Sequence, residues 1–141
     1  MIDKGKLDEI IMDIKMIEED EKALKLLIAI IKGRDGDINR TEIANDITAR
    51  LNKFFTDFEN YSRLFVYILI HEDDLIKSHN HAEAKYLTEL KTALLAQAGI
   101  LSPISKMSQE DKINSLRQNN NLIDLADNIL ALSHSVKINL N

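Results

Sequence analysis

Residues 24–31 read Leu-Lys-Leu-Leu-Ile-Ala-Ile-Ile, and this stretch decides the fold. In a helix its apolar side chains cover nearly every side, so other helices must enclose it. Upstream, apolar residues recur three or four positions apart, the spacing of one helix face, at Leu7, Ile10, Ile14 and Ile17. We therefore predict a first helix over about residues 6–32, amphipathic in its first half and enclosed in its second.

Few residues interrupt this helical spacing along the rest of the chain. One proline and four glycines occur in 141 residues, and these residue types most often end helices. Capping residues and apolar spacing predict further helices from near Arg40, from Asn80 to Gly99, from Ser108, and after Asn121. We predict an all-α compact bundle of five or six helices, a single domain over residues 1–141, with the tail at 137–141 either ordered or flexible.

Two segments decide how these helices are connected. Residues 100–107 contain Pro103 and are the clearest predicted connection. Residues 40–77 contain neither glycine nor proline, so they form one long helix or two. One straight helix of that length would span about 57 Å, whereas a compact domain of this size has a radius of gyration near 15 Å. A bend or break near Thr56 is therefore favoured over one helix.

Composition and charge exclude several classes of protein. Asp and Glu number 23 against 18 Lys and Arg, giving a net charge of −5, which opposes binding driven by phosphate neutralisation. The absence of cysteine excludes a disulfide framework, a thiolate zinc site and a cysteine nucleophile. The longest strongly apolar stretch, residues 64–70, falls well short of the roughly 20 residues of a membrane helix. With no leader-like pattern at the start, we expect a cytoplasmic, acidic protein.

The densest run of charge lies in the first predicted helix, at residues 18–21. Its last member, Glu21, falls where the helical spacing predicts an apolar residue. One interpretation is that this turn of the helix is exposed; the other is that it forms an interface with a basic partner, beside the apolar stripe. The residues of this candidate partner-binding site are Glu18, Glu19, Asp20, Glu21, Ile10, Ile14 and Ile17.

Residues 40–44, Arg-Thr-Glu-Ile-Ala, resemble the opening of the first helix of a helix-turn-helix domain. The turn that should follow is missing, because residues 47–49 contain no glycine and the apolar spacing continues. In a DNA-binding protein of this class, the candidate nucleic-acid contacts would be Arg50, Asn52 and Lys53. The acidic net charge makes this the alternative function rather than the first.

Asp35, Asp37 and Asn39 alternate as the first three ligands of a calcium loop do. The loop then departs from that pattern, with Arg40 where glycine makes the sharp turn and Asp46 where a bidentate glutamate belongs. We therefore interpret these residues as a polar turn before a capped helix.

Three of the four histidines and several carboxylates lie between His71 and Glu83, and all are transition-metal ligand types. His79 and His81 are two positions apart and diverge in a helix, so only a loop or strand would bring them together. We interpret the cluster as a solvated helix end. No metal, cofactor or catalytic residue is predicted.

By elimination, we predict a non-enzymatic protein–protein interaction module of the adaptor, chaperone, immunity or inhibitor type. It would bind a protein partner, or a second copy of itself as a homodimer, through an amphipathic helical surface. The alternative is a helix-turn-helix DNA-binding regulator, whose affinity for DNA would fall steeply with salt. An enzyme or metal protein, built on the cluster between His71 and Glu83, is the third class.

Overall fold

The computed structural model contains five helices in the part of the chain that it describes, residues 4–33, 41–58, 61, 65–66, 69–70 and 81–140, and no strand there. The prediction of an all-α single-domain bundle is confirmed. The helices are α1 (Lys4–Gly33), α2 (Thr41–Phe58), α4 (His81–Ser105), α5 (Gln109–Gln118) and α6 (Asn121–Leu140).

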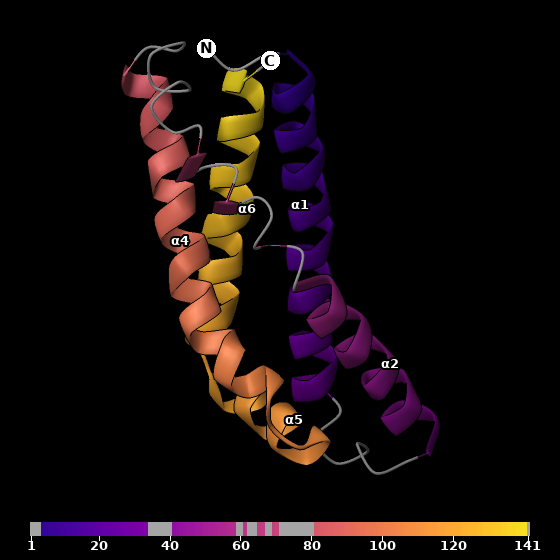
Figure 1. Cartoon of the computed structure of the whole chain (residues 1–141). Coiled ribbons are helices and arrows are strands. Elements are labelled where there is room, and N and C mark those ends of the chain that lie inside the picture. Colours follow the sequence, from indigo (N-terminus) through magenta and orange to yellow (C-terminus); the bar gives the residue numbers. More distant parts are fainter. Residues whose placement is uncertain are drawn as a thin grey trace.

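Helix α6 packs against both α1 and α4, and these three long helices run alongside one another (Figure 1). Helix α2 packs against α1. The short α5 contacts α1 and α4 at the end of the bundle opposite the two termini (Figure 1). The three long helices therefore form the body of the bundle, and α2 and α5 cover one end of it.

The core consists of two apolar clusters that follow each other along the bundle. In the first, the amphipathic half of α1 packs against the first half of α4 and the second half of α6. In the second, the apolar stretch of α1 packs against α2, α5 and the end of α4. Leu24, Leu27, Ile28 and Ile31 are all buried there, which confirms that residues 24–31 are enclosed. Burial of each of these side chains stabilises the folded state by about 1.5–3 kcal/mol.

Helix α4 extends beyond its predicted end. The sequence places a helix end at Gly99 and a connection over residues 100–107, but α4 continues through Pro103 to Ser105. Proline has no backbone N–H, so Pro103 cannot donate the helical hydrogen bond to the carbonyl of Gly99. A proline destabilises a helix interior by roughly 3 kcal/mol, and it destabilises a last turn by less. Continuing the helix buries Leu101 and Ile104 in the second cluster, which offsets that cost at about 1.5–3 kcal/mol each.

The other predicted boundaries agree with the structure where it describes them. The Oγ of Ser108 accepts a hydrogen bond from the backbone N–H of Asp111 at 3.2 Å, so the predicted cap of α5 is confirmed. The predicted separation of the last two helices is also confirmed, because α6 begins at Asn121. Helix α2 ends at Phe58, close to the favoured break near Thr56, and residues 59–60 beyond it lie outside the described part.

Candidate functional site

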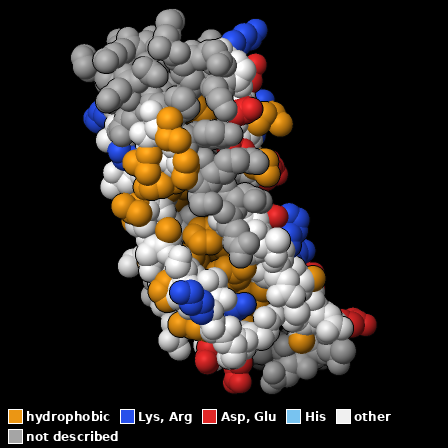
Figure 2. All heavy atoms as spheres, viewed as in Figure 1, with side chains coloured by type: hydrophobic (Ala, Val, Ile, Leu, Met, Phe, Trp, Pro, Cys, Tyr) orange, Lys and Arg blue, Asp and Glu red, His pale blue; other side chains and the backbone are white. Residues whose placement is uncertain are grey.

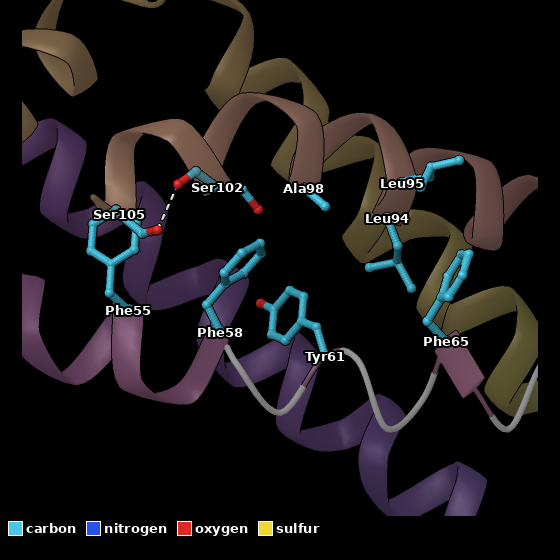
Figure 3. A pocket seen from close by; sticks show the side chains of 9 residues that line it. All are labelled: Phe55, Phe58, Tyr61, Phe65, Leu94, Leu95, Ala98, Ser102 and Ser105. Carbon is cyan, nitrogen blue, oxygen red and sulfur yellow. Dashed lines mark hydrogen bonds between the residues drawn. The ribbon is translucent and has the colours of Figure 1, made fainter. Parts of the chain in front are cut away.

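A pocket of about 390 Å³ opens between the end of α2 and one face of α4 (Figure 3). Aromatic residues are scarce in this chain, with four phenylalanines and three tyrosines, yet three of those phenylalanines and one of the tyrosines line the pocket. Its size lies in the range of about 300–1,000 Å³ typical of ligand sites. The lining residues are Phe55, Phe58, Tyr61, Phe65, Leu94, Leu95, Ala98, Ser102 and Ser105.

The α4 side of the pocket is a single helical face. Leu95, Ala98, Ser102 and Ser105 follow one another at intervals of three or four residues, which places them on one side of a helix. Ala98 leaves room between the aromatic rings and the helix (Figure 3). Leu95 is 60% exposed and stands at the rim. The pocket therefore has an apolar wall that continues onto the surface.

The opposite wall is a chain of aromatic rings on α2 and the residues that follow it. The rings of Phe54 and Phe58 are stacked with their centroids 6.0 Å apart, and the rings of Phe58 and Tyr61 are 5.0 Å apart. At one end, Lys112 of α5 places its Nζ 5.2 Å from the ring centroid of Phe55, a favourable cation–π distance. These contacts hold the wall in shape and put a positive charge beside it.

Behind this wall lies a buried acid, Glu21 of α1, which is 0% exposed. Its carboxylate accepts a hydrogen bond from the hydroxyl of Tyr61 at 3.0 Å and others from the side-chain amide of Gln97 on α4. Burial raises the pKa of Glu21 to about 7, while the bonds from Gln97 and Tyr61 oppose that rise. Burial also raises the pKa of Tyr61, so its hydroxyl stays a proton donor. Tyr61 thus lines the pocket with its ring and donates a hydrogen bond to Glu21 through its hydroxyl.

A second acid on the same turn, Asp20, faces α2. Asp20 is 8% exposed, and its carboxyl group lies within hydrogen-bonding reach of the carboxyl group of Asp57. Burial, and then the charge of Asp57, raise the pKa of Asp20 to about 6, while Lys53 opposes the rise. The Nζ of Lys53 lies 2.6 Å from Oδ2 of Asp57.

The structure corrects the interpretation of residues 18–21 as an exposed turn. Glu21 is buried and accepts hydrogen bonds from Tyr61 and Gln97, and Asp20 is buried beside Asp57. Glu18 pairs with Lys137 of α6 at 2.6 Å and is mostly covered. Of the four, only Glu19 points into solvent, with its side chain 78% exposed.

The apolar half of the predicted partner-binding site is also not on the surface. Ile10, Ile14 and Ile17 are buried in the first core cluster, between α4 and α6. In this fold they are therefore not exposed beside the acidic turn. Their helical spacing indicates a buried face, and two helices of the same chain cover it.

The alternative nucleic-acid residues lie on the exposed face of α2. Arg50 is paired with Asp46 at 3.1 Å and Lys53 with Asp57, while Asn52 is exposed. Residues 48–53 continue α2 without a turn, so α2 does not supply the second helix of a helix-turn-helix domain. The absence of that turn, expected from the sequence, is confirmed.

Two other sequence motifs fall outside the described part of the chain. They are the alternating Asp35, Asp37 and Asn39 and the residues from His71 to Asn80. His81 and Glu83 lie in the first turn of α4, but the structure does not describe their side chains. Within the described residues, no group of three or more His, Asp or Glu side chains is placed to hold a metal ion. None of the described helices is long and apolar enough to span a membrane.

The pocket is lined mainly by apolar and aromatic side chains, which suits it to binding apolar groups. Its polar members are hydroxyl groups, and that of Ser105 donates to the backbone carbonyl of Ser102 at 2.6 Å. The one strongly perturbed acid nearby, Glu21, is fully buried and sits behind Tyr61, so it does not reach the pocket's interior. Nothing among the lining residues pairs a nucleophile with a base.

Comparison with known proteins gives no further guide to this site. No protein-family model matches the chain, and neither a curated protein nor a solved structure matches it. The site was not predicted from the sequence, where Phe58, Tyr61 and Phe65 read as core positions of a helix. The available signal was the concentration of scarce aromatic residues between positions 54 and 67.

Proposed function

We propose that the protein is a non-enzymatic protein–protein interaction module that takes an apolar side chain of a partner's amphipathic helix into the pocket between α2 and α4. The observation that carries the proposal is the open, aromatic-lined pocket of about 390 Å³. Helices that dock in grooves do so through apolar anchors at helical spacing, and anchors bind most tightly in well-packed pockets.

The surface around the pocket supports a partner larger than a small molecule. Exposed apolar side chains occur at Leu95, which lines the pocket, and at Val66, Leu69 and Ile70, which follow the pocket residue Phe65 in the chain. Apolar atoms form a strip along α4 that runs down toward α2, with Lys or Arg atoms at its lower end (Figure 2). Extended apolar patches rimmed by polar groups mark interaction sites. A partner helix with an acidic residue near Lys112 would complement this strip.

The alternative of DNA binding has less support. Arg50 and Lys53 are each paired with a carboxylate of the same helix, so phosphate binding would have to break those pairs. The net charge of −5 would also repel DNA. A steep loss of affinity with salt, in a duplex DNA titration of the purified protein, would revive this alternative.

The test is site-specific crosslinking. A photoreactive p-benzoylphenylalanine replaces Leu95 at the rim, and a control places it at Leu26, which is 49% exposed on α1 and outside the pocket. Each version is also made with Ala98→Trp, which fills the pocket, or with Ala96→Trp, an exposed position on the same helix. Nuclease-treated lysate is the source of partner.

We expect one protein adduct from position 95 that disappears with Ala98→Trp and persists with Ala96→Trp. An adduct that is insensitive to Ala98→Trp, or equally strong from position 26, would overturn the proposal. An adduct of the protein with itself, at twice the mass of the chain, would assign the pocket to a second copy.

A further inference from the structure

We propose, on the basis of the proposed function, that the partner's anchor in the pocket between α2 and α4 is a tryptophan side chain. The aromatic rings of the pocket contact the indole ring, and the serine hydroxyl groups of α4 accept a hydrogen bond from its N–H. The partner is then a different protein rather than a second copy, because this chain contains no tryptophan.

The aromatic side of the pocket favours a flat ring as the occupant. The rings of Phe58 and Tyr61, both of which line the pocket, lie 5.0 Å apart and are tilted by 55°. Such a wall presents ring faces as well as ring edges, and aromatic pairs in these arrangements bind more strongly than their buried area alone accounts for. The volume of about 390 Å³ is also large enough for the largest aromatic side chain.

The polar atoms of the pocket are hydroxyl groups, and two of their three protons are already engaged. The hydroxyl of Tyr61 donates to Glu21 at 3.0 Å, and that of Ser105 donates to the backbone carbonyl of Ser102 at 2.6 Å. A hydroxyl group has one proton and two acceptor lone pairs, so Ser105 can still accept a hydrogen bond. Among the described lining residues, no side chain carries an N–H donor. The pocket therefore offers an occupant more acceptors than donors.

The serine acceptors lie where an occupant would cover them. Ser102 and Ser105 are on the α4 side of the pocket, and Figure 3 shows the hydroxyl of Ser102 pointing from α4 toward the aromatic side. Both residues are at least partly exposed, so water can reach their hydroxyl groups. A purely apolar anchor would exclude that water without replacing its hydrogen bonds, which weakens binding. An anchor that carries a donor restores the lost bond.

Indole meets these requirements better than the other aromatic side chains. The side chain of tryptophan has an N–H donor and no acceptor, so none of its polar atoms stays unpaired against acceptors. Phenylalanine has no donor. Tyrosine brings a donor together with an acceptor, and the protons of Tyr61 and Ser105 are not free to pair with that acceptor. Tryptophan is also enriched among the residues that contribute most to protein–protein affinity.

The test measures the dissociation constants of three small probes with the full chain, by ligand-observed NMR titration. The probe 3-methylindole reproduces the tryptophan side chain, and its isomer 1-methylindole has the same size but no N–H. The third probe, p-cresol, reproduces the tyrosine side chain. Ala98→Trp, which fills the pocket, and Ala96→Trp, at an exposed position of the same helix, establish where each probe binds.

We expect 3-methylindole to bind about tenfold more tightly than 1-methylindole, the effect of one hydrogen bond worth about 1.4 kcal/mol. The affinity for p-cresol should lie below that for 3-methylindole. Binding of all three probes should be lost in Ala98→Trp and retained in Ala96→Trp.

A double variant, Ser102→Ala with Ser105→Ala, removes both acceptors of α4. It should reduce the preference for 3-methylindole over its isomer to less than about twofold, with the affinity for 1-methylindole nearly unchanged. A purely structural effect of the substitutions would weaken both isomers equally. Ser135→Ala, on α6 and outside the pocket, is the matched control and should keep the full preference. Circular dichroism confirms that each variant is folded.

Four results would overturn the assignment of a tryptophan anchor. They are equal affinity for the two isomers, a preference that survives in the double serine variant, tighter binding of p-cresol than of 3-methylindole, and no binding of 3-methylindole in the pocket. The crosslinking at position 95 judges the proposed function separately. A pocket-dependent adduct whose crosslinked partner segment contains no tryptophan would retain the function and reject this anchor.

Discussion

Tyr61 and Glu21 are 40 residues apart in the chain, and the hydroxyl of Tyr61 donates to the carboxylate of Glu21 at 3.0 Å in the interior. This bond joins the aromatic wall of the pocket to the middle of α1. The carboxyl group is fully buried, so its ionised form is destabilised in the folded state. The stability of the fold should therefore report on the protonation of this one group.

Replacing Glu21 with glutamine should change how stability depends on pH. The folded pKa of about 7 lies above the ordinary value of 4.5, so the folded state holds a proton that the unfolded chain loses. The wild type therefore loses stability as pH rises from about 4.5 to 7. The difference between the free energies of unfolding of Glu21→Gln and the wild type should therefore shift by about 3 kcal/mol in favour of the variant between pH 4.5 and pH 8.

Denaturant titrations at several pH values measure this difference. Glu19→Gln is the matched control, because Glu19 is exposed on the same turn, and its difference from wild type should stay nearly constant. A constant difference for Glu21→Gln as well would show that Glu21 is not buried as described.

Replacing Tyr61 with phenylalanine should destabilise the protein more at pH 8 than at pH 5. At pH 8 the lost bond is to an ionised carboxylate, worth about 1.5–3 kcal/mol, and at pH 5 it is to a neutral one, worth about 0.5–1.5 kcal/mol. Tyr86→Phe, on the partly exposed surface of α4, should change stability little at either pH. Carbon-13 NMR of the Glu21 carboxyl group should show a higher pKa in Tyr61→Phe, and a lower one would contradict this account.

Adjacent leucines in α1 give a direct test of the enclosed stretch. Leu27 is 1% exposed and Leu26 is 49% exposed. Leu27→Ala should cost about 2–5 kcal/mol in the free energy of unfolding, through lost burial and a cavity in the second cluster. Leu26→Ala should stay within about 0.5 kcal/mol of wild type. Equal losses from the two substitutions would mean that the orientation of α1 is wrong.

The cap of α5 should be measurable in the same way. Ser108 accepts the hydrogen bond from the N–H of Asp111 at 3.2 Å, and Ser108→Ala should destabilise the protein by about 0.5–2 kcal/mol. Ser108→Asp should retain most of the stability, because aspartate accepts the same bond and favours a helix N-terminus. A loss in Ser108→Asp as large as in Ser108→Ala would argue against the cap.

Much of the fold could be predicted from the sequence because local spacing carries it. The period of the apolar residues in α1 and the cap at Ser108 depend on residues only a few positions apart, and the structure confirms both. The end of α4 could not be predicted in this way. Pro103 is a local signal for a break, whereas the burial of Leu101 and Ile104 that outweighs it depends on α1, α2 and α5.

The candidate site was less predictable for the same reason. Glu21 at an apolar position of α1 was visible in the sequence, but its donors lie 40 and 76 residues away. Without those donors, an exposed turn is the simpler expectation for four consecutive acids. Likewise, Phe58 and Tyr61 have the spacing of core residues, and only the arrangement of α4 shows that they line an open pocket.

Phe58 packs against both core clusters while lining the pocket. The two halves of the bundle therefore meet at a side chain that an occupant of the pocket would touch. Native-state amide exchange would reveal this as shared protection, because a ligand that immobilises Phe58 stabilises both halves against local opening. A ligand in this surface pocket would therefore increase amide protection in both core clusters, along the three long helices.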